Sequence, residues 1–115
     1  MEFKTIIASV KPNYTNDVVD AAKAAGATGA TIIQARGTGI REAKTFFGLS
    51  LETQTDIIFF LTEQHVVDQI VDAIKEAGEF HKPGTGIAFV LPVEKVIGLE
   101  SQMKKYEQGI KKQGE

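Results

Sequence analysis

The hydrophobic positions of this chain fall into four short runs and two longer periodic segments. The runs are rich in β-branched and aromatic residues and are bounded by proline, glycine or polar residues, which is typical of strands. They cover residues 3–10, 29–35, 56–61 and 87–91. The first run is uninterrupted and therefore predicts a buried, central strand. Pro12 ends it, because proline cannot donate to a sheet ladder.

Apolar residues recur at helical spacing in two segments, which lie after the first and third runs. These segments cover residues 17–25 and 66–77. The halves also share letters, since residues 18–26 align with residues 70–78 and each stretch ends on a glycine that we take as the helix cap. The pattern predicts an α+β, ferredoxin-like βαββαβ domain. In that fold the sheet is antiparallel, the first and third strands are central, and both helices cover one face.

The other face of this sheet needs a cover. Ile6, Ala8 and Val10 are predicted to point to one face and Thr5, Ile7 and Ser9 to the other, while residues 56–61 are apolar toward both faces. A large uncovered apolar face is unusual on a monomer, so we expect further subunits to cover it. The alternative is that residues 98–115, a polar segment expected to be helical or frayed, fold over the sheet and so cover the domain formed by residues 1–97.

A long segment, residues 38–54, joins the second and third predicted strands. Most hairpin loops have about 2–5 residues, and much longer ones are usually functional or disordered. Arg41, Phe46 and Phe47 lie in this segment and would form a docking surface for a partner. The alternative is that the segment extends both strands and places its aromatic side chains on its own sheet.

Two Gly-Thr-Gly tripeptides mark the ends of predicted strands. Gly37-Thr38-Gly39 follows the second strand, and Gly84-Thr85-Gly86 precedes the fourth. Backbone amides of such turns form concave anion sites, and the nearby Lys82 adds a point charge for a phosphate. We place the two turns at opposite ends of the sheet, so that one ligand can join them only across a subunit boundary. The alternative is that each tripeptide is simply a turn.

Composition excludes several classes of function. The chain has 115 residues, enough for one domain, and no cysteine, which excludes disulfides and thiolate chemistry. Its 13 basic and 15 acidic residues form no basic stripe suited to nucleic acid. No apolar run is long enough to span a membrane, and the N-terminus lacks the pattern of a signal peptide, so we expect a cytoplasmic protein. His65 and His81 have no partners at metal-ligand spacing, and no catalytic constellation is present, so we predict neither a metal site nor an enzyme.

Five motifs, taken together, resemble the PII signal-transduction family over residues 3 to about 97. The glycine-rich segment that runs into the fourth strand is the most specific of them and is similar to the family's B-loop. The motifs are Lys11-Pro12, Asn16-Asp17-Val18, Gly29-Ala30-Thr31, Arg36-Gly37-Thr38-Gly39 and residues 82–93.

This resemblance implies a homotrimer with inward-facing sheets and with ATP, ADP or AMP bound in clefts between subunits. It also implies a regulator whose T-loop, here residues 38–54, docks on a protein target such as a transporter or metabolic enzyme. Mapped onto this chain, the implied nucleotide contacts are Thr31, Gly37, Thr38 and Gly39 from one subunit, and Lys82, Gly84, Thr85 and Gly86 from the next.

Three positions depart from the family's basic phosphate contacts. Ile87 stands where the family has a lysine after the B-loop glycines, and Gly98 and Glu100 stand where it has Arg-x-Arg. Each lost cation removes a charge-assisted contact of about 1.5–3 kcal/mol, which indicates weaker ATP binding or a ligand with fewer phosphates. Two alternatives share the fold: a trimeric metal-handling protein similar to the divalent-cation tolerance proteins, and an acylphosphatase-type hydrolase, which needs an arginine that residues 11–16 lack.

Overall fold

A computed structural model describes residues 2–37, 45–46, 49–50 and 53–99. Within these ranges the regular elements follow the predicted order, with two additional short strands between the second and third predicted ones. The elements are β1 (Phe3–Val10), α1 (Thr15–Ala24), β2 (Thr31–Gly37), β3 (Thr45–Phe46), β4 (Leu49–Ser50), β5 (Thr53–Glu63), α2 (Val67–Ala77) and β6 (Gly86–Val93), with 3₁₀ turns at Pro12–Tyr14 and Gln64–Val66.

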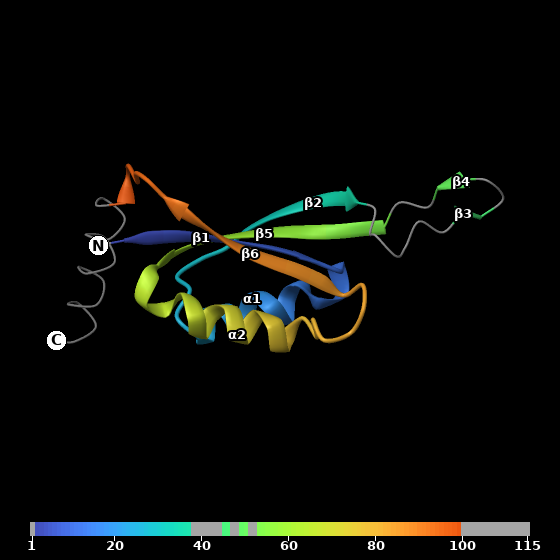
Figure 1. The fold of residues 1–115 in the computed structure, drawn as a ribbon, viewed down its shortest axis with the longest axis horizontal. Helices are drawn as coiled ribbons and strands as arrows, with labels where there is room; N and C mark the ends of the chain where they lie inside the picture. The colour runs from blue at the N-terminus through green and yellow to red at the C-terminus, as the bar shows by residue number, and fades with distance from the viewer. Residues whose placement is uncertain (1, 38–44, 47–48, 51–52, 100–115) are drawn as a thin grey trace.

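The four long strands form one antiparallel sheet in the order β2-β5-β1-β6. Both helices lie against the same face, and the chain enters and leaves each helix at the ends of the sheet (Figure 1). This confirms the predicted ferredoxin-like fold, with the first and third predicted strands in the centre. Among the described helices, none is both long and apolar enough to span a membrane.

Strand boundaries differ from the prediction at both ends of the long connection. The second strand was predicted at residues 29–35 but begins at Thr31 and continues to Gly37, and the third extends over 53–63 rather than 56–61. Their ladder continues to the pair Gly37–Thr53, whereas β1 already ends opposite Asp56. Residues 35–37 and 53–55 therefore form a two-stranded extension of the sheet, which we call the β2–β5 ribbon.

The predicted docking residues fall largely outside the described part of the chain. Arg41 and Phe47 lie outside the described residues, and for Phe46 only the backbone is described, where it pairs with Leu49 in the β3–β4 hairpin. The prediction that these residues bind a partner therefore stays a prediction.

Alternation along the central strands builds the core between the sheet and the helices. Ile6, Ala8 and Val10 of β1, which were predicted to share one face, are buried, and Ile58 and Phe60 of β5 lie beside them in register. The helices contribute one apolar stripe each, formed by Val18 and Ala22 of α1 and by Val67, Ile70 and Ile74 of α2.

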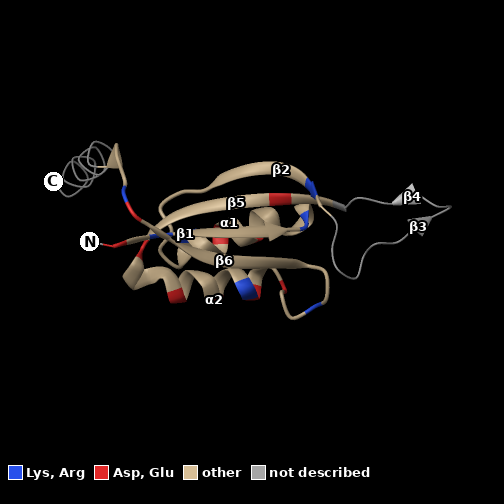
Figure 2. Cartoon of the chain, turned by 45° about the horizontal axis from the view of Figure 1, so that its top comes forward, with Lys and Arg blue, Asp and Glu red and all other residues tan. Residues whose placement is uncertain are grey.

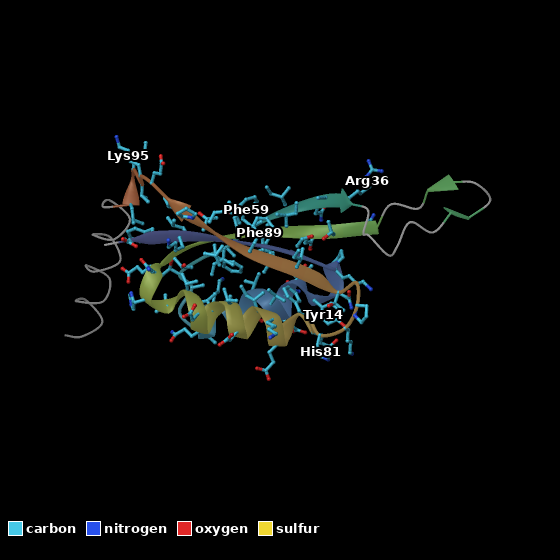
Figure 3. The ribbon with its side chains drawn as sticks, viewed as in Figure 1. Tyr14, Arg36, Phe59, His81, Phe89 and Lys95 are labelled. Atoms are coloured by element: carbon cyan, nitrogen blue, oxygen red, sulfur yellow. The ribbon has the colours of Figure 1, made fainter. Side chains whose placement is uncertain are left out.

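The opposite sheet face, which we call the open face, is apolar across all four strands. Phe59 and Phe89 project from it, away from both helices (Figure 3), and charged residues are sparse along the strands (Figure 2). Phe89 retains 46% of its accessible surface in the single chain. The register places the following large apolar residues on this face: Ile7, Ile33, Ile57, Phe59, Leu61, Ile87, Phe89 and Leu91.

Both helices end in the same hydrogen-bonded cap, but a glycine occupies its left-handed position only in α1. There Gly26 has φ 125°, and the amide of Ala27 donates to the carbonyl of Ala22. In α2 the matching amide of Phe80 donates to Lys75, and the left-handed residue is Glu79 with φ 53°. The alignment of Gly26 with Gly78 as equivalent caps was therefore wrong by one residue, because α2 is one residue longer than α1.

Candidate functional site

Gly37, at the end of β2, and the turn before β6 lie at the same end of the sheet, which corrects the prediction that the two glycine tripeptides lie at opposite ends. β1 is antiparallel to β6, so β6 begins where β1 finishes, with Gly86 opposite Val10. β2 runs parallel to β1, two strands away, so Gly37 also lies beyond that end. Two strands separated by one antiparallel neighbour run in the same direction, and the prediction had not taken this into account. In Figure 3, Arg36, Tyr14 and His81 all lie at this end.

The turn between α2 and β6, residues 78–86, is held rigidly by one buried hydroxyl. Thr85 is 5% exposed, and its Oγ1 donates to the carbonyls of Glu79 and Lys82, at 2.8 and 3.0 Å. The carbonyl of Thr85 in turn accepts from the amide of Lys11 at 3.2 Å. These bonds tie the turn both to itself and to the end of β1, so Thr85 has a structural role in addition to its predicted contact.

Glycine is required at two places in this turn, for different reasons. Gly84 has φ 78°, a conformation that side chains disfavour, and it makes no hydrogen bond to another described residue. A Cβ on Gly86 would lie 2.6 Å from the Phe80 ring and 2.7 Å from the carbonyl oxygen of Ser9. Gly84 is thus an exposed residue whose amide has no partner among the described residues, while Gly86 lets β6 approach β1.

Three side chains form a hydrogen-bonded group on this turn, which we call the Tyr14–Glu79–Lys82 network. The Tyr14 hydroxyl, from the 3₁₀ turn after β1, donates to Oε2 of Glu79. The Lys82 ammonium donates to the same oxygen at 3.1 Å. Lys82 and Glu79 remain 54% and 36% exposed, so the group lies at the surface, where a ligand can reach it.

The network shifts the pKa values of two of its members in opposite directions. The hydrogen bond from Tyr14, followed by the one from Lys82, lowers the pKa of Glu79 below its ordinary 4.5. The bond to the Glu79 carboxylate raises the pKa of Tyr14 above its ordinary 10.0. At neutral pH the turn therefore holds an ionised carboxylate next to the lysine predicted to meet a phosphate.

A polar pocket of about 340 Å³ lies at the same end of the sheet, under the β2–β5 ribbon. Asp56 on its wall accepts a hydrogen bond of 2.6 Å from Thr15 Oγ1, which joins the pocket to the start of α1. Tyr14 is the N-cap residue of α1, and no side chain forms a capping hydrogen bond there. The pocket is lined by Pro12, Gln34, Ala35, Arg36, Gln54, Thr55 and Asp56.

The described chain does not bring all the predicted nucleotide contacts together. Lys82, Gly84, Thr85 and Gly86 share the turn, and Gly37 lies at the same end of the sheet. Thr31 is level with Phe59 in mid-sheet, about 20 Å from Gly37 at roughly 3.3 Å per residue. Thr38 and Gly39 lie outside the described residues.

Sequence reasoning missed Tyr14, Glu79 and Asp56. A weak signal was available for Glu79, because it precedes Lys82 by three residues, a spacing at which opposite charges pair. Tyr14 is 65 positions from Glu79, so only the folded chain reveals their contact.

Metal binding finds no support in the described part of the chain, where no group of three or more His, Asp or Glu side chains is arranged to hold an ion. Of the two histidines considered, His65 instead contacts a single carboxylate, Glu63, at 3.2 Å.

Comparison with known proteins assigns the chain to a family. The sequence profile of the family Nitrogen regulatory protein P-II matches residues 3–103, nearly the whole chain. This chain belongs to the P-II family. The Nitrogen regulatory protein P-II of Pasteurella multocida (strain Pm70) is 32% identical over 104 residues, covering 85% of this chain and 92% of the relative.

Two further P-II relatives match over similar lengths. The Nitrogen regulatory protein P-II of Azospirillum brasilense is 29% identical, over 88% of this chain and 95% of its own. The Nitrogen regulatory protein P-II 1 of Escherichia coli (strain K12) is 30% identical, over 85% of this chain and 92% of its own. The matches confirm the resemblance drawn from the motifs, and the chain is thereby a signal-transduction regulator of the P-II type.

Proposed function

We propose that this P-II protein binds an adenine nucleotide, ATP, ADP or AMP, in clefts between the subunits of a homotrimer. Binding then regulates a partner protein, such as a transporter or metabolic enzyme, through residues 38–54. The observation that carries this proposal is turn 78–86, where the exposed Lys82 lies two residues from the exposed Gly84, whose amide has no hydrogen-bond partner among the described residues. Free amides and a lysine are the groups that hold phosphates in proteins.

Two features of the fold support a site shared between subunits. The open face leaves large apolar side chains exposed in the single chain, and packing against further copies would cover them. The segment after β6, residues 94–99, leaves the sheet at the end remote from turn 78–86 (Figure 1). Among the predicted contacts within the described residues, only Thr31 is distant, about 20 Å from Gly37 along β2, so Thr31 and turn 78–86 reach one nucleotide most simply if two chains supply them.

The test is a binding titration of the intact chain with ATP, ADP, AMP and cyclic AMP, together with its mass by light scattering. Lys82→Ala should weaken binding about 10- to 100-fold, the loss expected for one charge-assisted phosphate contact. Lys75→Ala is the matched control, because Lys75 is an exposed lysine in α2, near the same turn. Equal affinities of the two variants, or a mass of one chain, would refute the proposal.

A further inference from the structure

We infer that Glu79 is a specificity-determining residue that makes turn 78–86 favour ligands with one phosphate over polyphosphates. This inference rests on the proposed function, because it concerns the ligand of the same site. It starts from the counter-ion of Lys82. The ammonium that would meet a phosphate lies 3.1 Å from Oε2 of Glu79, so its charge is already balanced by a group of the protein.

The carboxylate is fixed in place, unlike most acids in surface ion pairs. Its Oε2 accepts from both Lys82 and Tyr14, and Tyr14 belongs to a segment that precedes α1. Surface ion pairs contribute little when both side chains are free to move. Here the second donor holds the carboxylate at the turn even when a ligand draws Lys82 away.

The backbone conformation of Glu79 also supports a role for its carboxylate. Its φ of 53° is the left-handed conformation for which glycine is the usual residue after a helix, and Gly26 occupies the equivalent place after α1. A residue with a side chain is energetically disfavoured in this conformation. The chain tolerates this cost at the one described non-glycine residue with positive φ, and the carboxylate is what it gains there.

The turn carries one lysine and one acid. In residues 78–86 these are Lys82 and Glu79, and the next residue is the apolar Ile87 rather than a second cation. A monophosphate can take Lys82 and the amide of Gly84 while Tyr14 retains Glu79. Each further phosphate adds negative charge near a carboxylate that stays in place, and repulsion between like charges grows with every unit.

The test compares ATP with AMP as ligands of the intact chain, titrated without divalent cations at low and high salt. Glu79→Gln keeps an acceptor for Tyr14 but removes the charge. We expect it to raise the affinity for ATP relative to AMP about five- to tenfold at low ionic strength, and by less at 1 M salt. Glu76→Gln, an exposed acid in α2 with the same change in net charge, should leave the ratio unchanged.

Titration with inorganic phosphate and with tripolyphosphate separates the inference from the proposed function. Binding of each anion is measured from the NMR amide signals of turn 78–86. A shifted ratio for these anions without nucleotide binding supports the role of Glu79 and refutes the nucleotide. Nucleotide binding with equal ratios in wild type, Glu79→Gln and Glu76→Gln refutes the role of Glu79 and leaves the nucleotide in place. If no anion binds to any variant, both are wrong.

Discussion

Gly86→Ala is the sharpest test of how turn 78–86 is joined to the sheet. Gly86 has no positive φ, so its backbone suits alanine, and only the surroundings oppose the new methyl group. That methyl would lie 2.6 Å from Cε1 of Phe80 and 2.7 Å from the carbonyl oxygen of Ser9. Both separations are far below ordinary van der Waals contact.

The size of the expected stability loss depends on which neighbouring group can move. The Phe80 ring is a side chain that can rotate, but the Ser9 carbonyl belongs to the β1–β6 ladder and moves only if that ladder shifts. Overpacking of this kind costs about 1–3 kcal/mol of unfolding free energy. Replacing glycine also stiffens the unfolded chain, which returns about 0.4–1 kcal/mol. We therefore expect a net loss of roughly 1–2 kcal/mol.

Urea denaturation at a fixed protein concentration measures this loss, with Gly29→Ala as the control. A Cβ on Gly29 has no atom within 4 Å, so that variant should be neutral or slightly more stable. Phe80→Leu should rescue Gly78→Ala, whose closest contacts are with the Phe80 ring, but should not fully rescue Gly86→Ala. Wild-type stability of Gly86→Ala, or its full rescue by Phe80→Leu, would refute the assignment of the clash to the Ser9 backbone.

Four further outcomes are expected. Thr85→Val removes the hydroxyl that bonds the carbonyls of Glu79 and Lys82 and should lower the unfolding free energy by about 1–3 kcal/mol, measured in urea. In an NMR titration, Glu79 should have a pKa below 4.5, so its stabilising contribution is present above that pH and is lost as pH falls through the lowered value; Tyr14→Phe should move this pKa upward. Phe89→Glu on the open face should reduce the assembly's mass in light scattering, whereas Ile97→Glu, 85% exposed beyond β6, should not. Replacing residues 38–52 by Asn-Gly should leave the melting temperature nearly unchanged, because a two-residue turn can close the ladder at Gly37–Thr53; a large drop would contradict that register.

The sequence was sufficient for the fold because each local signal agreed with the others. Alternation placed Ile6, Ala8 and Val10 together on one face, which proves to be the buried one, and the runs of β1 and β6 were recognised to within two residues. The helix caps were harder, because Gly78 looks like the partner of Gly26 although the left-handed position falls on Glu79.

The candidate site was predictable only in part, for a reason of topology. Glycines and a lysine close together in the sequence indicate a phosphate-binding turn, which is why Lys82 and Gly84 were predicted as contacts. The relative placement of Gly37 and Gly86 depends on strand direction across the sheet, and that step was misjudged. Contacts such as Tyr14 to Glu79 join residues far apart in the chain, and no periodicity encodes them.

The β2–β5 ribbon gives residues 38–52 a stiff mechanical connection to the body of the domain. β5 is a central strand, so continuous hydrogen-bonded backbone connects Thr53 to the middle of the sheet. The first side chain along that strand to bond beyond the ribbon is Thr55, whose Oγ1 donates to the carbonyl of Val10, and Asp56 beside it accepts from Thr15 at the beginning of α1. The ribbon is therefore anchored both to the end of β1 and to the base of a helix.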